Sequence, residues 1–171
     1  MSAPAYPSTR VGANVGTPQD ERPEMAEADL FDLERFVIAQ EPVFSTVLDE
    51  LKAGQKRSHW MWFIFPQLRS LGRSPTAEFY GLRSLDEARA YLAHPVLGPR
   101  LILCTETGLA VEGRSLQAIF GSPDDLKFCS SMTLFTLAAG EVGGVFERAL
   151  DRYCGSRLDE RTVALCDAGA G

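Results

Sequence analysis

The sequence predicts a mainly α-helical protein with a single compact domain of about seven to nine short helices and little or no sheet. Apolar residues recur at helical spacing along most of the chain. Helix start and stop residues bound short segments, and no stretch shows sustained alternation of apolar and polar residues. With 171 residues, of which 45% are hydrophobic, the chain can bury one core without metals or disulfides.

The N-terminal segment has a different composition from the rest of the chain. Residues 1–28 hold four prolines among scattered small and acidic residues, and they lack apolar periodicity. Such a segment cannot bury enough surface to offset its ordering entropy. We therefore predict a disordered proline-rich tail at 1–28, followed by a single helical domain at 29–171.

The first helices have recognisable ends. The domain begins near Asp29 with apolar residues at helical spacing. The second helix should start at Pro42, because proline suits a first helical position, and stop at Gly54. A short helix should open at Ser74-Pro75 and close at Gly81.

The middle of the chain contains a capping box at 84–87. The Ser84 hydroxyl is expected to accept from the third helical N–H, while Glu87 reaches back toward the cap. The helix should end before His94-Pro95, and a new one should begin at Gly98-Pro99. Another short helical turn follows at 115–120.

The clearest helix start is Ser122-Pro123-Asp124-Asp125. Serine would cap, proline would take the first helical position, and two acids would favour the positive end of the dipole. The helix should run to about Ala139. Asp159 is expected to cap a last helix.

Composition excludes several function classes. The net charge of −6 argues against binding to duplex nucleic acid, where a basic face supplies affinity. No run is long enough to span a bilayer, and the N-terminus lacks a secretory signal pattern, so we expect a cytoplasmic protein without a membrane partner.

Two histidines and cysteines without CxxC spacing predict no metal and no cofactor. The expected state of the cysteines is four buried free thiols: Cys104, Cys129, Cys154 and Cys166.

The segment 57–67 holds both tryptophans of the chain beside a histidine and two phenylalanines. Between Glu50 and Glu78 there are five basic residues and no acidic one. Arginines with tryptophans provide donors for a phosphate and faces on which a planar base can stack. A ligand-binding wall is therefore expected at Arg57, Trp60, Trp62, Gln67, Arg69 and Arg73. In the alternative interpretation, the aromatic rings belong to the core and the cations pair elsewhere or are solvated.

The helix after Ser122 is apolar on nearly every side, which predicts burial. A buried Lys127 would need a partner or would give up its proton. Asp124 lies three residues before it on the same helical face. This pair is either a structural contact or part of a polar pocket with Ser130, Ser131 and Thr133. His59 is a candidate general acid or base, or else a histidine of the core.

Three motifs resemble those of an uncharacterised bacterial and fungal family. They are KRSHWMWFIFPQ at 56–67, AYLAHPVLG at 90–98, and IFGSPDDLK continuing to SSMTLF at 119–135. The resemblance covers about 29–153, departs from the family pattern at Cys129, and implies a mainly helical fold. Members often carry the label calpastatin, which we do not transfer because the chain lacks repeated disordered inhibitor segments. A weaker similarity links it to NADAR-type proteins, helical enzymes that process ADP-ribose attached to bases.

Three functions stay open at this point. In an N-glycosidic hydrolase, Arg57 and Arg73 would hold phosphates while Lys127, Asp124 and His59 would do acid–base or covalent work. In a binding module, the same wall would hold a nucleotide or another phosphate-bearing small molecule. In a structural or protein-interaction domain, the aromatic segment would be wholly core; protein partners are left open. We expect the aromatic segment and the helix after Ser122 to pack together. Their polar residues should converge on a cavity rimmed by Arg57, Arg69 or Arg73.

Overall fold

The structure is a computed structural model that describes residues 30–169. These residues form ten α-helices and one 3-10 helix, and none of them forms a strand. The mainly α single-domain prediction is confirmed, with slightly more helices than expected, whereas the tail predicted at 1–28 lies outside the described residues. No helix of the described part has the length and apolarity to cross a membrane. The elements are α2 (Glu34–Gln40), α3 (Phe44–Lys52), α4 (Met61–Ile64), η1 (Arg69–Leu71), α5 (Pro75–Tyr80), α6 (Leu85–Ala93), α7 (Leu97–Leu109), α8 (Leu116–Phe120), α9 (Asp124–Ala139), α10 (Val145–Tyr153) and α11 (Glu160–Gly169).

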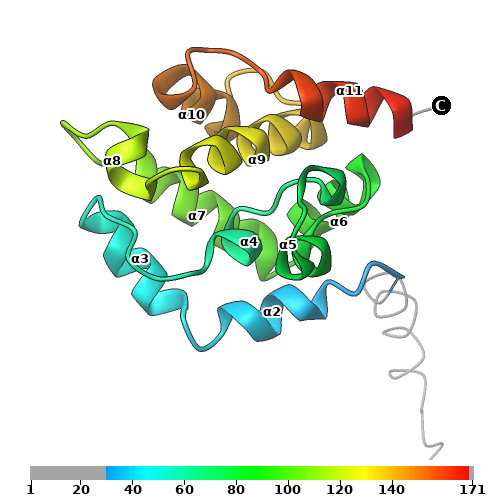
Figure 1. Ribbon diagram of the computed structural model, residues 1–171, viewed down its shortest axis with the longest axis horizontal. Helices are drawn as coiled ribbons and strands as arrows, with labels where there is room; N and C mark the ends of the chain where they lie inside the picture. Colours follow the sequence, from blue (N-terminus) through cyan, green and yellow to red (C-terminus); the bar gives the residue numbers. More distant parts are fainter. Residues whose placement is uncertain (1–29, 170–171) are drawn as a thin grey trace, which may run out of the picture.

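Helix α9 is the centre of the fold. It packs against α6, α8, α10 and α11, and Figure 1 shows it between the last two helices on one side and α4 with α5 on the other. Its buried residues point in all directions around its axis, as expected for a helix that is apolar on every side. They are Phe128, Ser130, Ser131, Met132, Thr133, Leu134 and Phe135.

Serine side chains cap three of the helices, where the sequence predicts a cap by Ser84, a helix start at Ser74-Pro75 and a helical turn at 115–120. The hydroxyls of Ser74, Ser84 and Ser115 each accept from a backbone N–H three residues later, at 3.1 Å. Each bond satisfies one of the amides that a helix start leaves without a partner. Gly81 follows α5 directly, and Gly54 follows α3 with a φ of 69°.

Three other predicted helix starts are displaced. Helix α7 begins at Leu97 rather than at Gly98-Pro99. Helix α3 begins at Phe44 rather than at Pro42. Helix α9 begins at Asp124, with Pro123 at the cap position, and no side chain caps it there. The nearest substitute is the Asp125 carboxylate, which accepts from the Leu126 N–H at 2.9 Å.

The capping box at the start of α6 is only half formed. Ser84 caps, but Glu87 does not reach back to it. Its carboxylate accepts instead from the Arg83 N–H and from the guanidinium of Arg35 on α2, the latter at 3.1 Å. A long-range partner therefore replaces the local contact that the sequence pattern suggests.

The motif at 90–98 has a structural explanation. His94 Nδ1 accepts from the N–H groups of Val96 and Leu97, at 3.1 and 3.3 Å, and so satisfies the start of α7. A side chain at Gly98 would place its Cβ 2.1 Å from the Leu92 carbonyl oxygen. Glycine is thus required where α7 approaches the end of α6.

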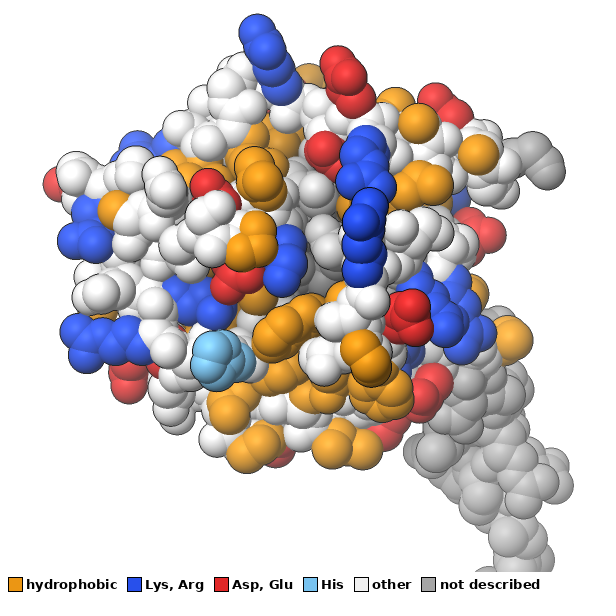
Figure 2. All heavy atoms as spheres, viewed as in Figure 1, with side chains coloured by type: hydrophobic (Ala, Val, Ile, Leu, Met, Phe, Trp, Pro, Cys, Tyr) orange, Lys and Arg blue, Asp and Glu red, His pale blue; other side chains and the backbone are white. Residues whose placement is uncertain are grey.

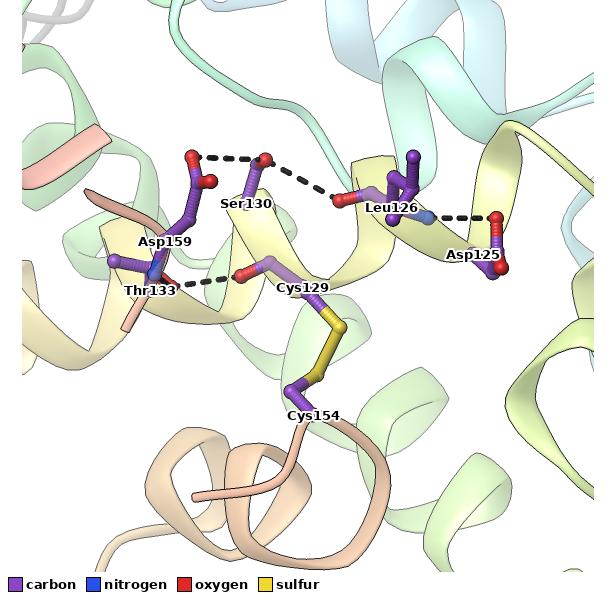
Figure 3. Close-up of a disulfide and its surroundings, with 7 residues drawn as sticks. All are labelled: Asp125, Leu126, Cys129, Ser130, Thr133, Cys154 and Asp159. Carbon is purple, nitrogen blue, oxygen red and sulfur yellow. Dashed lines mark hydrogen bonds between the residues drawn. A yellow bond between two sulfur atoms is a disulfide. The ribbon is translucent and has the colours of Figure 1, made fainter. Parts of the chain in front are cut away.

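The predicted state of the cysteines is wrong for one pair. Cys129 on α9 and Cys154 at the end of α10 form a disulfide, with Cα atoms 5.9 Å apart (Figure 3). Cys104 and Cys166 are buried free thiols, as expected. The spacing of 25 residues between the bonded cysteines matches no motif, so only the packing of α9 against α10 brings them together.

Candidate functional site

The aromatic segment and the start of α9 pack against each other, as predicted. Phe65 lies 5.1 Å from Phe128 and 5.8 Å from Phe120, measured between ring centroids. Trp60 lies 6.2 Å from Phe120. Tilted and edge-on aromatic contacts of this kind join the two motifs in one core.

Glu50 on α3 fixes the chain that leads into the aromatic segment. Its carboxylate accepts from the N–H groups of Arg57 and Ser58, from the Ser58 hydroxyl, and from Trp60 Nε1 at 3.0 Å. Burial alone would raise the pKa of Glu50, but these four hydrogen bonds outweigh it and lower the pKa to about 2. Trp60 is only 1% exposed and its indole N–H is satisfied, so it belongs to the core and has no free face for a ligand.

A row of charges crosses the region where the motifs meet. The Asp124 carboxylate lies 3.0 Å from Lys56 Nζ and 3.4 Å from Lys127 Nζ. Each ammonium also lies over a tryptophan ring, at 5.2 Å from Trp60 for Lys56 and 5.1 Å from Trp62 for Lys127. Two ammonium groups share a single carboxylate, so these three side chains together carry a net positive charge.

The buried lysine of this row is not the one expected. The side chain of Lys56 is 8% exposed, whereas that of Lys127 is 26% exposed. Lys127 is thus a partly exposed, ion-paired cation at the edge of the core. It is free to reach a ligand on its exposed side while Asp124 and Trp62 hold its position.

An open cavity of about 730 Å³ lies beside Lys127. It is bounded by the segment after α4, by the first turns of α9, and by the connection from α10 to α11. Figure 2 shows this face hollowed near its centre, with Lys and Arg side chains bordering the hollow. The lining residues are Gln67, Leu71, Leu116, Pro123, Asp125, Leu126, Lys127, Cys129, Ser130, Tyr153, Cys154, Arg157, Leu158, Asp159 and Arg161.

The cavity carries unpaired positive charge. Its cations are Lys127, Arg157 and Arg161, and its acids are Asp125 and Asp159. Neither arginine forms a salt bridge within residues 30–169. Both arginines are exposed, and with Lys127 they give the lining of the cavity three cations against two acids, in a chain with a net charge of −6.

Two of the predicted polar residues hold the wall of the cavity rather than facing a ligand. The Ser130 hydroxyl donates to Asp159 Oδ2 at 3.1 Å, and the Thr133 hydroxyl accepts from the Asp159 N–H at 2.8 Å (Figure 3). Asp159 in turn caps α11 as predicted, by accepting from the Thr162 N–H at 3.1 Å. These contacts fasten the start of α11 to α9. Ser131 is fully buried, and its hydroxyl finds no partner among the described residues.

The structure does not bring the predicted arginines to this cavity. Arg57, Arg69 and Arg73 are exposed, and none of them is among its lining residues. Arg69 instead faces a separate hollow of about 150 Å³ that it shares with Arg35. His59 is exposed too, and its ring makes no hydrogen bond within the described part of the chain.

Gln67 lines the large cavity, and Trp62 lies beside it in a neighbouring recess. An isolated bridge between Leu68 and Leu82 fixes the backbone at Gln67, whose carbonyl accepts from the Leu82 N–H at 3.0 Å. Gln67 and Lys127 also line a small recess that adjoins the cavity and contains Trp62 and Tyr80. Trp62 Nε1 is buried and has no acceptor within residues 30–169.

Sequence reasoning missed Arg157 and Arg161. Both lie beyond the last recognised motif, in a polar stretch without periodicity, so no local signal distinguishes them. The only local indication of their position is Asp159, the predicted cap of the last helix. A capped helix start that packs on α9 necessarily carries its neighbours to the same surface.

Comparisons with known proteins agree with the resemblance drawn from the motifs. Over residues 30–166 the sequence matches the family described as "Protein of unknown function (DUF1810)". One similar solved structure is that of the conserved hypothetical protein Rv1873 from Mycobacterium tuberculosis, with 58% sequence identity and a TM-score of 0.78. That similarity covers 80% of this chain and 97% of the other. Comparison with curated proteins finds no match.

Proposed function

We propose that this chain, which belongs to the DUF1810 family of proteins of unknown function, binds a phosphate-bearing small molecule of the nucleotide type. The observation that carries the proposal is the open cavity in which Lys127 meets the two unpaired arginines Arg157 and Arg161. Its volume of about 730 Å³ falls in the range of small-molecule sites.

The chemistry of the cations suits a phosphate group. A guanidinium offers two parallel N–H donors to one phosphate, and a lysine adds a point charge. The Oδ2 atom of Asp159 already accepts from Ser130 and Thr162, but the negative charges of Asp159 and Asp125 offset two of the three cations. Asp124 lies behind Lys127 and orients its ammonium. An incoming anion would therefore find donors that need no rearrangement of existing ion pairs.

The adjoining recess, of about 10 Å³, has room for one acceptor atom of the same ligand or for one water molecule, and not for a whole base. The Trp62 indole N–H is a buried donor without an acceptor among the described residues. Gln67 offers both a donor and an acceptor. The ring carbonyl or ring nitrogen of a base is an acceptor of that kind. Gln67 and Lys127 line both hollows, so a ligand in the cavity lies beside the mouth of the recess, and its base has to lie in the cavity itself.

Isothermal titration with ADP-ribose, and with pyrophosphate as the fragment without base, tests the proposal. Arg157→Ala and Arg161→Ala should each weaken binding by about 10-fold or more, since a hydrogen bond to a charged group contributes about 1.5–3 kcal/mol. Arg57→Ala is the matched control, because that arginine is exposed outside the cavity and should leave the affinity unchanged. Equal losses in all three variants, or no binding by the wild-type protein, would reject the site.

N-glycosidic hydrolysis is the alternative function. It would use Lys127 as a nucleophile or acid–base group, yet this ammonium is shared between Asp124 and the Trp62 ring rather than desolvated and free. His59 lies on the surface. These contacts favour binding over cleavage. Turnover of ADP-ribosylated nucleosides by the wild type, abolished in Lys127→Ala, would establish the enzyme instead.

A further inference from the structure

The Cys129–Cys154 disulfide is part of the cavity wall. Both cysteines are among the lining residues, and both are only half buried. The two free thiols, Cys104 and Cys166, are buried elsewhere. Burial raises the pKa of Cys104 to about 12 and also raises that of Cys166, so neither provides a thiolate that could exchange with the disulfide.

The disulfide is one of two attachments that hold the α10–α11 connection against α9. It fixes Cys154, the residue that ends α10. The second attachment is Asp159, which is held by Ser130 and Thr133. Between these two points the chain turns through Gly155 and Ser156, whose φ angles are 65° and 57°.

Arg157 depends on the first attachment and Arg161 on the second. The Arg157 N–H donates to the Cys154 carbonyl at 3.3 Å, and the Ser156 N–H before it donates to the Leu150 carbonyl of α10 at 3.1 Å. Arg161 stands in the first turn of α11, directly after the Asp159 cap. Opening the disulfide removes the covalent attachment of Cys154 to α9, so the part of the wall that carries Arg157 is then held by these backbone hydrogen bonds alone, while α11 stays fastened.

We propose that the Cys129–Cys154 disulfide is a redox-controlled clamp that holds Arg157 in the anion-binding cavity. Reduction by a dithiol breaks the S–S bond, transfers two electrons and two protons to the cysteines, and leaves the reductant as a disulfide. The connection at 155–158 then gains mobility relative to α9, and Arg157 is no longer held in the cavity. The effect on ligand affinity rests on the binding function proposed above, whereas the release of the connection does not.

The test compares the oxidised protein with the protein reduced by dithiothreitol. Thiol titration after unfolding should count two thiols in the oxidised form and four in the reduced form, in keeping with one disulfide among four cysteines. Amide hydrogen exchange at 155–158 should accelerate on reduction, while that of α11 should stay unchanged. Exchange that is equal in both forms would overturn the clamp, as would four thiols in the protein before reduction.

Ligand titrations with ADP-ribose and pyrophosphate then separate the clamp from the binding site. Reduction should weaken wild-type binding to the level of oxidised Arg157→Ala. Arg157→Ala should show no further redox effect, and Arg161→Ala should keep the full redox effect. A Cys129→Ser/Cys154→Ser variant should match the reduced protein under both conditions. A redox effect that persists in Arg157→Ala would overturn the assignment to that arginine. If neither probe binds either form, the proposed function fails, and hydrogen exchange alone decides the clamp.

Discussion

Replacing Glu50 by alanine is expected to lower the free energy of unfolding by about 3–5 kcal/mol, because several buried donors lose their acceptor at once and each costs about 1–3 kcal/mol. The donors are the N–H groups of Arg57 and Ser58, the Ser58 hydroxyl, and Trp60 Nε1. Water can hydrate the more exposed of these donors in the variant, so the loss of stability stays below the sum of the costs of the individual donors. Urea denaturation at neutral pH measures the change.

The same carboxylate should make stability sensitive to acid. Its pKa is about 2 in the folded protein, below its ordinary value of 4.5, so its stabilising contribution is complete above about 4.5 and is lost as the pH falls toward about 2. Glu50→Gln removes the titration but keeps the shape of the side chain. The difference in stability between wild type and Glu50→Gln should therefore shrink over this interval.

Asp49 provides the control for Glu50. It lies next to it on α3, is exposed, and makes no salt bridge or side-chain hydrogen bond within residues 30–169. Asp49→Ala should change the free energy of unfolding by less than about 0.5 kcal/mol. If Glu50→Ala were as mild as this control, Glu50 would not organise the entry to the aromatic segment.

The second large effect is expected at Glu87. Its side chain is fully buried, lies 3.1 Å from the Arg35 guanidinium, and accepts from the Arg83 N–H. Arg35 also donates to the carbonyls of Phe79, in the last turn of α5, and of Gly81, directly after it. Glu87→Ala leaves a buried guanidinium without its counter-charge, which should cost about 3–5 kcal/mol in the free energy of unfolding.

The exposed pair on the same helix is the control for Glu87. Arg89 and Asp86 lie 3.1 Å apart, but their side chains are 54% and 77% exposed. Arg89→Ala should cost less than about 1 kcal/mol, because water and salt screen a surface pair. Comparable thermal denaturation midpoints for the Glu87 and Arg89 variants would show that Glu87 is not the anchor of α6.

Local chemistry was enough to predict much of the fold. Ser74, Ser84 and Ser115 cap helices because the stabilising bond spans only three residues. Where a distant group competes, the prediction fails. Glu87 turns away from its own cap because the Arg35 guanidinium offers a charged partner, and α9 starts one residue later than its serine and proline suggest.

The site was predictable only in part, for the same reason. The packing of the aromatic segment on α9 follows from two apolar segments that share one core, and it was foreseen. The positions of the cations do not follow from composition. Lys56 and Lys127 belong to different motifs, yet the single carboxylate of Asp124 holds both. Arg157 and Cys154 reach the cavity through the fold alone.

A crystal structure of the oxidised protein with bound ADP-ribose tests the central claim most directly. We expect phosphate oxygens within hydrogen-bonding distance of the Arg157 and Arg161 guanidiniums and of Lys127 Nζ, with the base in the same cavity. The account would be contradicted by phosphates bound at Arg57, Arg69 or Arg73, or by an unoccupied cavity at a ligand concentration that saturates the protein in solution.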